Sequence, residues 1–327
     1  MGNDKKYMRR CLQLAENGRQ NAQPNPMVGA VITDKCGNII GEGYHIRCGE
    51  AHAEVNAFAD CERRGNNHLL PEATIYVSLE PCAHYGKTPP CADLIIRKGV
   101  KRVVVGCVDS FSEVSGRGIQ RIKDAGIEVT VGVLEEECKE LNRAFFTYHT
   151  LHRPFITLKW AQSADGFIDK DFKPIRISNA KTTMLAHKLR AENNAILVGR
   201  TTLERDKPSL NVREWHGKNP KKYVLSTSSL ENLEHLEHLE NLGNLGNLES
   251  LESLENLEHL PHQTLLVEGG AATHRYFIEQ GLWDLIRVET SPTLFHNGTK
   301  AATIPANAML VSEKCYDGNI IREYRRI

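Results

Sequence analysis

Residues 52–91 read HAEVNAFADCERRGNNHLLPEATIYVSLEPCAHYGKTPPC, and they carry the most informative pattern of the chain. His52 and Glu54 stand at the start of this stretch, and Cys82 and Cys91, each preceded by proline, stand at its end. One imidazole and two thiolates form a set that Zn²⁺ binds tetrahedrally, and catalytic sites leave the fourth position to water. Glu54 is then available to move protons for that water. The sequence therefore predicts one zinc ion per chain, held by His52, Cys82 and Cys91.

The order His-x-Glu followed by Pro-Cys-x-x-Cys is typical of zinc deaminases that act on bases. Here eight residues, 83–90, separate the two cysteines instead of two. A structural zinc site is normally closed by four protein ligands, and His84 as a fourth ligand would close this one. If His84 is not a ligand, the fourth position holds a water molecule, and zinc lowers the pKa of that water to about 7. Glu54 is then the group that accepts the water proton and delivers it to departing ammonia.

Strand and helix signals alternate around this pattern. We expect helices over residues 5–17, 52–64, 92–98, 120–125 and 135–148, and strands over 28–33, 39–44, 74–79, 102–107 and 128–133. This alternation is typical of a three-layer α/β sandwich, which we expect to span residues 1–150. Both thiolates are expected at the start of a helix, whose positive end favours deprotonated sulfur.

A second alternating region predicts another α/β domain over residues 151–327. A helix is expected over 181–192, with strands over 155–161, 195–199, 222–226, 264–268, 285–290, 309–314 and 320–325. Within it, leucine stands at every third position from Leu230 to Leu260. A step of three advances about 300° around an α-helix, so these leucines form no single helical face. The tract is either a partner-binding arm or a solvent-facing, low-complexity insert over residues 229–260, and we favour the insert.

Composition limits the function further. A chain of 327 residues is long for one core, and no apolar run reaches the length of a membrane span. Nine scattered cysteines suit a reducing, cytoplasmic setting. The leucine tract holds eight Glu and neither Lys nor Arg, so the rest of the chain has a formal net charge of +8. That excess suits phosphorylated small molecules and provides no dense basic stripe for nucleic acid, and we expect neither nucleic acid nor membrane as a partner.

Four segments of the first domain resemble the bifunctional deaminase/reductase family of riboflavin biosynthesis. They are PNPMVG at 24–29, GEGYH at 41–45, HAE at 52–54 and EPCAHYGKTPPC at 80–91. The resemblance implies a cytidine-deaminase-like domain that deaminates 2,5-diamino-6-ribosylamino-4(3H)-pyrimidinone 5′-phosphate. It also implies substrate-binding roles for Asn25, His45, His84, Lys87 and Asp109. Lys87 would supply the cation that a phosphorylated substrate needs, whereas Phe111 replaces an Asn found in many relatives.

The second domain resembles the reductase half of the same family, which has a dihydrofolate-reductase-like α/β fold. The matching segments are LKWAQSADG at 158–166, TLERDKPSLNVR at 202–213 and LLVEGG at 265–270. The resemblance implies NADPH-dependent reduction of the ribosyl side chain to ribityl, with Lys159 as the proton source. It further implies substrate contacts by Arg190, Leu210, Arg213 and Glu268, and cofactor contacts by Gln162, Thr202, Asp206, Gly270, Ala271, Ala272 and Thr273. Relatives form homo-oligomers, and we expect one here.

Three other hypotheses remain open on the sequence alone. The leucine tract fills most of residues 227–263, beside the expected cofactor site, so the reductase half could be weakened or inactive. The chain could instead be a zinc-stabilised scaffold whose leucine tract binds a partner. A free-standing nucleoside or tRNA-editing deaminase would carry a Cys-x-x-Cys gap and no equivalent of Lys87. We expect the bifunctional enzyme.

Overall fold

The structure is a computed structural model that describes residues 2–85, 89–109, 116–225, 248–251 and 253–327. The chain divides into two compact units, Met1–Leu151 and His152–Ile327. Within the described ranges, no helix combines the length and apolar character that crossing a membrane requires.

A five-stranded sheet forms the centre of the first unit, in the order β2-β1-β3-β4-β5. β1 pairs antiparallel with β2 and β3, whereas β3, β4 and β5 run parallel. β3 and β4 are buried along nearly their whole length, as parallel strands covered on both faces are. The strands are β1 Gly29–Thr33, β2 Ile39–Tyr44, β3 Thr74–Leu79, β4 Arg102–Cys107 and β5 Glu128–Val131.

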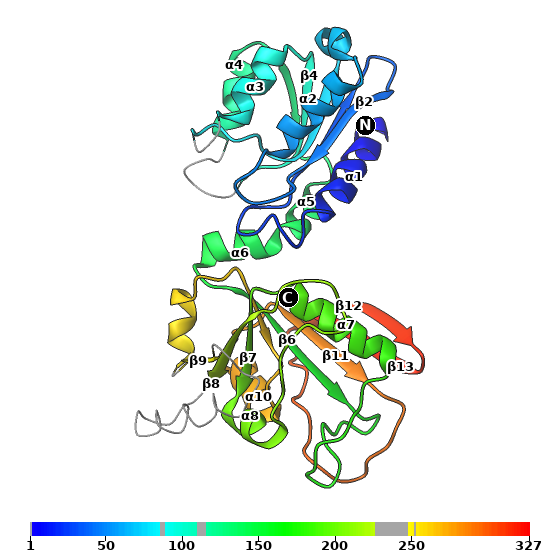
Figure 1. The fold of residues 1–327 in the computed structure, drawn as a ribbon, viewed down its shortest axis with the longest axis vertical. Helices are drawn as coiled ribbons and strands as arrows, with labels where there is room; N and C mark the ends of the chain where they lie inside the picture. Colours follow the sequence, from blue (N-terminus) through cyan, green and yellow to red (C-terminus); the bar gives the residue numbers. More distant parts are fainter. Residues whose placement is uncertain (1, 86–88, 110–115, 226–247, 252) are drawn as a thin grey trace. The chain divides into compact units, whose positions relative to one another are not determined.

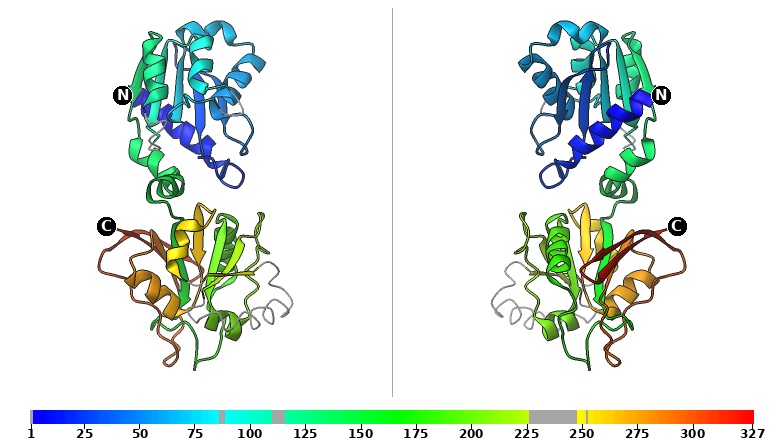
Figure 2. Two further views of the ribbon diagram at one scale, coloured as in Figure 1. Left: turned by 90° about the vertical axis from the view of Figure 1, so that its left-hand side faces the viewer. Right: turned by 90° about the vertical axis from the view of Figure 1, so that its right-hand side faces the viewer.

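Helices cover both faces of this sheet (Figures 1 and 2). On one face, α1 (Gly2–Glu16) and α5 (Glu135–Leu141) pack against alternate strand residues such as Val104. On the other face, residues such as Val103 pack against α2 (Ala53–Arg63), α3 (Cys91–Lys98) and α4 (Arg117–Asp124). A 3₁₀ helix, η1 (Asn67–Glu72), precedes β3. The predicted three-layer sandwich is therefore confirmed.

The single helix predicted over residues 135–148 is wrong in one respect. The structure has two helices there, α5 and α6 (Arg143–Leu151), separated at Asn142. The Asn142 side chain accepts a hydrogen bond from the Met27 N–H and donates one to the Met27 carbonyl, both at 2.8 Å. These bonds hold Asn142 outside regular helical geometry and tie it to the loop that enters β1.

The second unit contains an eight-stranded mixed sheet, in the order β12-β13-β11-β6-β10-β7-β8-β9. The six strands β11, β6, β10, β7, β8 and β9 each run parallel to their neighbours in this order. β13 runs antiparallel to both β11 and β12. The strands are β6 Phe155–Gln162, β7 Ala195–Gly199, β8 Lys221–Leu225, β9 Leu248–Leu251, β10 Thr264–Val267, β11 Leu285–Thr290, β12 Ala308–Tyr316 and β13 Asn319–Arg326.

Helices cover the two faces of this sheet as well (Figure 2). Phe277 of α10 (Ala271–Glu279) packs on one face, in a cluster with Leu158 of β6. Leu189 of α7 (Ala180–Ala191) and Leu203 of α8 (Arg200–Asp206) pack on the other face. The predicted second α/β domain is therefore confirmed, whereas α8 and β9 were not anticipated.

The prediction of a solvent-facing leucine tract is wrong for residues 248–260. β9 extends the sheet beside β8, and the 3₁₀ helix η3 (Leu254–His259) follows it. All five leucines of this part are buried, at positions 248, 251, 254, 257 and 260. The rest of the tract, residues 230–247, lies outside the described residues.

A three-residue repeat fits these two elements although it does not fit an α-helix. Side chains alternate along a strand, so positions three apart point to opposite faces. Accordingly, Leu248 packs in the cluster under α7 and Leu251 in the cluster under α10. A 3₁₀ helix has three residues per turn, so every third side chain falls on one face. Leu254, Leu257 and Leu260 all join the α10-side core in this way.

Candidate functional site

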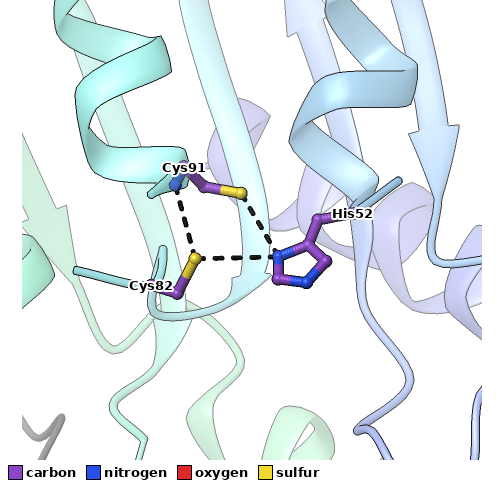
Figure 3. A group of neighbouring side chains, drawn as sticks. All are labelled: His52, Cys82 and Cys91. Carbon is purple, nitrogen blue, oxygen red and sulfur yellow. Dashed lines mark hydrogen bonds between the residues drawn. The ribbon is translucent and has the colours of Figure 1, made fainter. Parts of the chain in front are cut away.

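The three predicted zinc ligands come together in the first unit (Figure 3). His52 is the N-cap of α2, with extended backbone angles, and Cys91 is the first residue of α3. Cys82 follows β3 in a loop, and its sulfur accepts the Cys91 N–H at 3.3 Å. The expectation that both thiolates stand at the start of a helix is thus correct for Cys91, whereas Cys82 lies in a loop. The Cys82 sulfur nevertheless lies at the amino end of α3, through its bond to the Cys91 N–H.

Distances within this group match a tetrahedral metal site. His52 Nδ1 lies 3.7 Å from the Cys82 sulfur and 3.4 Å from the Cys91 sulfur. Zn–N and Zn–S bonds of about 2.0 and 2.3 Å give a nitrogen–sulfur edge of about 3.5 Å in a tetrahedron. Among the described residues, the group contains these three side chains alone, and His84 is exposed outside it. The arrangement is that of a site that keeps one position open.

Glu54 supplies an acid–base group beside the ligands. Its side chain is buried in the first turn of α2, and burial, together with the charge of Cys82, raises the pKa of Glu54 to about 7. A hydrogen bond with Cys91, supported by one with His52, lowers the pKa of the Cys82 thiol. A carboxyl group with a pKa near neutral is well suited to accept and return a proton.

Two of the predicted substrate residues lie next to this group. Asn25 Nδ2 is 3.2 Å from His45 Nε2, and the His45 ring meets the His52 ring edge-on at a centroid distance of 5.4 Å. Burial lowers the pKa of His45. Asp109, after β4, is half-buried, and His84 is exposed. Lys87 and Phe111 lie outside the described residues.

In the second unit, Arg190 and Glu268 are each other's partners. The guanidinium makes two bonds to the Glu268 carboxylate, at 3.1 and 2.7 Å, and a third to the Asn211 carbonyl at 3.1 Å. Burial opposes the charge on Glu268, but the charges of Arg190 and Lys159 lower the pKa of this carboxyl. Lys159, Arg190 and Glu268 thus form one charged cluster on the face of the sheet that α7 covers.

The two other predicted substrate residues of this unit are placed differently. Arg213 is exposed, and its side chain is hydrogen-bonded to Ser209. Leu210 has a left-handed backbone, with φ of 52°, and its side chain lies in the core. Any substrate contact of Leu210 must therefore come from its backbone.

A cavity of about 630 Å³ opens where β7 and β10 lead into α8 and α10. Five of the predicted cofactor residues line it: Thr202, Gly270, Ala271, Ala272 and Thr273. The Gly270 N–H donates to the Thr202 hydroxyl at 2.8 Å, and a Cβ on Gly199 would lie 2.2 Å from the Thr273 hydroxyl. Glycine at position 199 thus allows the two helix starts to approach each other. The volume is within the usual range for a ligand site.

Two predicted cofactor residues do not line this cavity. Gln162 lines a separate, polar cavity of about 330 Å³, and Asp206 is ion-paired with Arg205. Conversely, the larger cavity is lined by Arg200, Arg205 and Arg275, which the sequence did not single out. Arginines on helix surfaces are common, so only the fold reveals that these three meet at a cavity.

The fold and the metal group together define the class of the protein. Residues 1–107 match the family of the cytidine and deoxycytidylate deaminase zinc-binding region, and residues 154–307 match the RibD C-terminal domain family. The chain thus joins a unit of the zinc-binding deaminase type to one of the RibD C-terminal type.

Comparison with individual proteins defines the family. A crystal structure of the diaminohydroxyphosphoribosylaminopyrimidine deaminase/5-amino-6-(5-phosphoribosylamino)uracil reductase of Thermotoga maritima superposes with a TM-score of 0.86. It is 33% identical, over 100% of this chain and 99% of that one. RibD of Acinetobacter baumannii superposes with a TM-score of 0.83 and 30% identity, again over 100% and 99%. The chain belongs to the RibD family of bifunctional riboflavin-biosynthesis proteins.

Curated relatives align over a shorter region. The riboflavin biosynthesis protein RibD of Aquifex aeolicus is 48% identical over 211 residues, which is 64% of this chain and 58% of that protein. RibD of Escherichia coli is 42% identical over 64% of this chain and 56% of its own length. The aligned region is thus less than two thirds of the length of these curated relatives.

Proposed function

We propose that the chain catalyses two consecutive reactions on a phosphorylated pyrimidine. The first is hydrolytic deamination of 2,5-diamino-6-ribosylamino-4(3H)-pyrimidinone 5′-phosphate, and the second is NADPH-dependent reduction of the ribosyl side chain to ribityl. The observation that carries the proposal is the open group of His52, Cys82 and Cys91 beside buried Glu54. Family membership supports the second reaction.

In the deaminase unit, His52, Cys82 and Cys91 would hold the metal, and Glu54 would move the proton. A bound Zn²⁺ would lower the pKa of a water molecule to about 7. Glu54 takes a proton from the attacking water and returns one to the departing amino group, so water replaces ammonia at the ring carbon. Asn25 and His45, which contact each other next to His52, are placed to orient the pyrimidine.

In the reductase unit, the cavity at Gly270–Thr273 would hold the phosphates of NADPH at the start of α10. The three arginines that line it would contribute positive charge for this anion, although Arg200 and Arg205 are also ion-paired with carboxylates. When bound, NADPH would supply a hydride, and Lys159, inside the charged cluster with Glu268, would supply the proton. Arg190 holds Glu268 in place through its two hydrogen bonds.

Glu54→Gln tests the first reaction. The amide cannot exchange a proton with water, so we expect zinc to be retained and deamination to fall by about 100-fold or more. Glu62→Gln, on the exposed face of the same helix, is the control and should behave as wild type. Turnover by Glu54→Gln at the wild-type rate would remove Glu54 from its role.

A second assay separates the bifunctional enzyme from one with an inactive reductase half. Purified protein is mixed with NADPH and the deaminated intermediate, and absorbance of NADPH is followed. We expect NADPH to be oxidised. No change in absorbance, with deamination intact, would favour a deaminase whose second half is inactive.

We also propose that the enzyme is a cytoplasmic homo-oligomer whose partners are small phosphorylated molecules, with neither nucleic acid nor membrane involved. The edge strand β12 supports self-association, because Met309, Leu310 and Val311 are exposed on it. Light scattering on the purified protein measures the oligomeric state.

A further inference from the structure

Glu80 is a buried carboxylate that the proposed chemistry does not use. It stands between β3 and the metal ligand Cys82, and its side chain is 5% exposed. Its own N–H bonds to the Cys107 carbonyl at the end of β4, at 3.0 Å. This bond fixes the Glu80 backbone at the ends of two parallel strands: β3, which leads to Cys82, and β4, which leads to Asp109.

Both oxygens of Glu80 accept backbone N–H groups from residues that follow β4 and from α4. Oε2 accepts from Asp109 at 3.3 Å and from Gly116 at 2.9 Å. Oε1 accepts from Gly118 at 2.9 Å and from Ile119 at 3.3 Å. One oxygen thus binds residues on either side of positions 110–115, and the other binds the first turn of α4. Hydrogen bonds to a charged acceptor are stronger than neutral ones.

The start of α4 also touches the Cys82 loop directly. A Cβ on Gly118 would lie 1.9 Å from the Pro81 carbonyl oxygen, so only glycine permits this approach. Further along α4, Arg121 is ion-paired with Asp93 of α3 at 2.7 Å. The Cys82 loop, the helix that begins at Cys91 and the start of α4 therefore form one connected assembly, with Glu80 at its centre.

We propose that Glu80 is a positioning residue of the deaminase site. It holds Asp109 and the start of α4 at a fixed place beside the Cys82 loop, so that Asp109 can bind the substrate next to the metal. The inference rests on the proposed deaminase function for its effect on substrate. Glu80 acts through the residues that it binds: the hydrogen bonds of its carboxylate in the described part of the chain go to the backbone N–H groups of residues 109, 116, 118 and 119.

Glu80→Gln tests this inference in the full-length, zinc-loaded protein. A glutamine keeps one acceptor oxygen but turns an NH₂ group toward the other pair of N–H donors, which are then left unpaired. We expect the KM for the pyrimidine phosphate to rise by about tenfold or more, with a smaller change in kcat. Zinc content and the visible spectrum of the cobalt-substituted protein should stay as in wild type. Glu80→Asp keeps the charge, so its KM should lie between those of wild type and Glu80→Gln.

Two controls make the result specific. Glu137→Gln removes the same charge from an exposed position and should leave the KM unchanged. NADPH oxidation with the deaminated intermediate should be equal in all variants, because Glu80 belongs to the other unit. Equal KM values in Glu80→Gln and wild type would overturn the inference, and so would loss of zinc in Glu80→Gln, since Glu80 would then build the metal site itself.

Amide hydrogen exchange separates this inference from the proposed function. The amides of Gly116, Gly118 and Ile119 should exchange faster in Glu80→Gln than in wild type, whereas the core strand β4 should not change. If wild type fails to deaminate the substrate, the proposed function is wrong, and the exchange result alone decides whether Glu80 holds the start of α4. Unchanged exchange at these three amides would overturn the inference in either case.

Discussion

At the scale of single residues, the surroundings of a buried ionisable group decide whether it can take part in catalysis. Glu54 and His274 are both buried, but their surroundings differ. Glu54 lies next to two thiols and a histidine, so its proton can be exchanged with a reacting group. His274 lies under the sheet, packed on the Trp160 ring at a centroid distance of 5.1 Å, with its Nε2 3.1 Å from the Val267 carbonyl. The first arrangement suits catalysis and the second suits structure.

His274 should make the stability of the second unit depend on pH. Burial, with the charge of Lys159, lowers the pKa of His274 to about 4, whereas an exposed histidine has a pKa of about 6.5. Between these values the unfolded chain binds a proton that the folded chain excludes. The free energy of unfolding should therefore be highest above pH 6.5 and fall as the pH drops toward 4, by about 1.4 kcal/mol per pH unit from this group.

Urea unfolding followed by tryptophan fluorescence measures this effect. Trp160, Trp215 and Trp283 all lie in the second unit, so the signal reports that unit alone. His274→Gln can still donate to the Val267 carbonyl but does not titrate, so its stability should fall less between pH 6.5 and 4. Identical pH dependence in both proteins would show that His274 is not the group responsible.

The site residues differed in how readily sequence could reveal them. His52, Glu54, Cys82 and Cys91 form a pattern because zinc chemistry demands those residue types at the ends of neighbouring elements. Glu80 has no such signature, although it lies two residues from Cys82. Its four partners are backbone amides of residues 109–119, and backbone groups leave no mark in the sequence.

At the scale of elements, the strands were predictable and the leucine tract was not. β3 and β4 are short, β-branched runs between helices, and the predicted bounds agree with the structure. The step of three in the leucine tract fits neither the period of an α-helix nor that of a heptad coiled coil. A strand and a 3₁₀ helix do fit a step of three. The strand β9 forms because it pairs with β8 at the edge of the sheet, and this pairing cannot be predicted from the leucine spacing alone.

Leu257→Ala tests whether the tract belongs to the core. Leu257 is 1% exposed in η3 and shares a cluster with Tyr223 and Trp283. Removing a buried leucine side chain typically costs about 2–5 kcal/mol, and we expect a loss of that size in the unfolding free energy of the second unit. Glu258→Ala, at the exposed neighbouring position, is the control. If Leu257→Ala unfolds with the same free energy as wild type, η3 is not packed against the core of the second unit.

At the scale of the whole molecule, the two units have separate cores. The buried residues of the clusters under the first sheet end at Cys138, with Phe146 packed against one of them, and those under the second sheet start at Ile156. The metal ligands belong to the first unit, and the cavity at Gly270 belongs to the second. The residues that we propose for each of the two reactions therefore lie within a single unit.

Cys91→Ser should consequently abolish one activity and spare the other. Serine does not replace a thiolate ligand of zinc, so we expect loss of bound zinc and a fall in deamination by about 100-fold or more. NADPH oxidation with the deaminated intermediate should stay at the wild-type rate, and the tryptophan-detected unfolding transition should not move. Cys48→Ser, at an exposed cysteine of the same unit, should affect neither activity. A parallel loss of NADPH oxidation in Cys91→Ser would mean that the reductase unit depends on the metal site of the other unit.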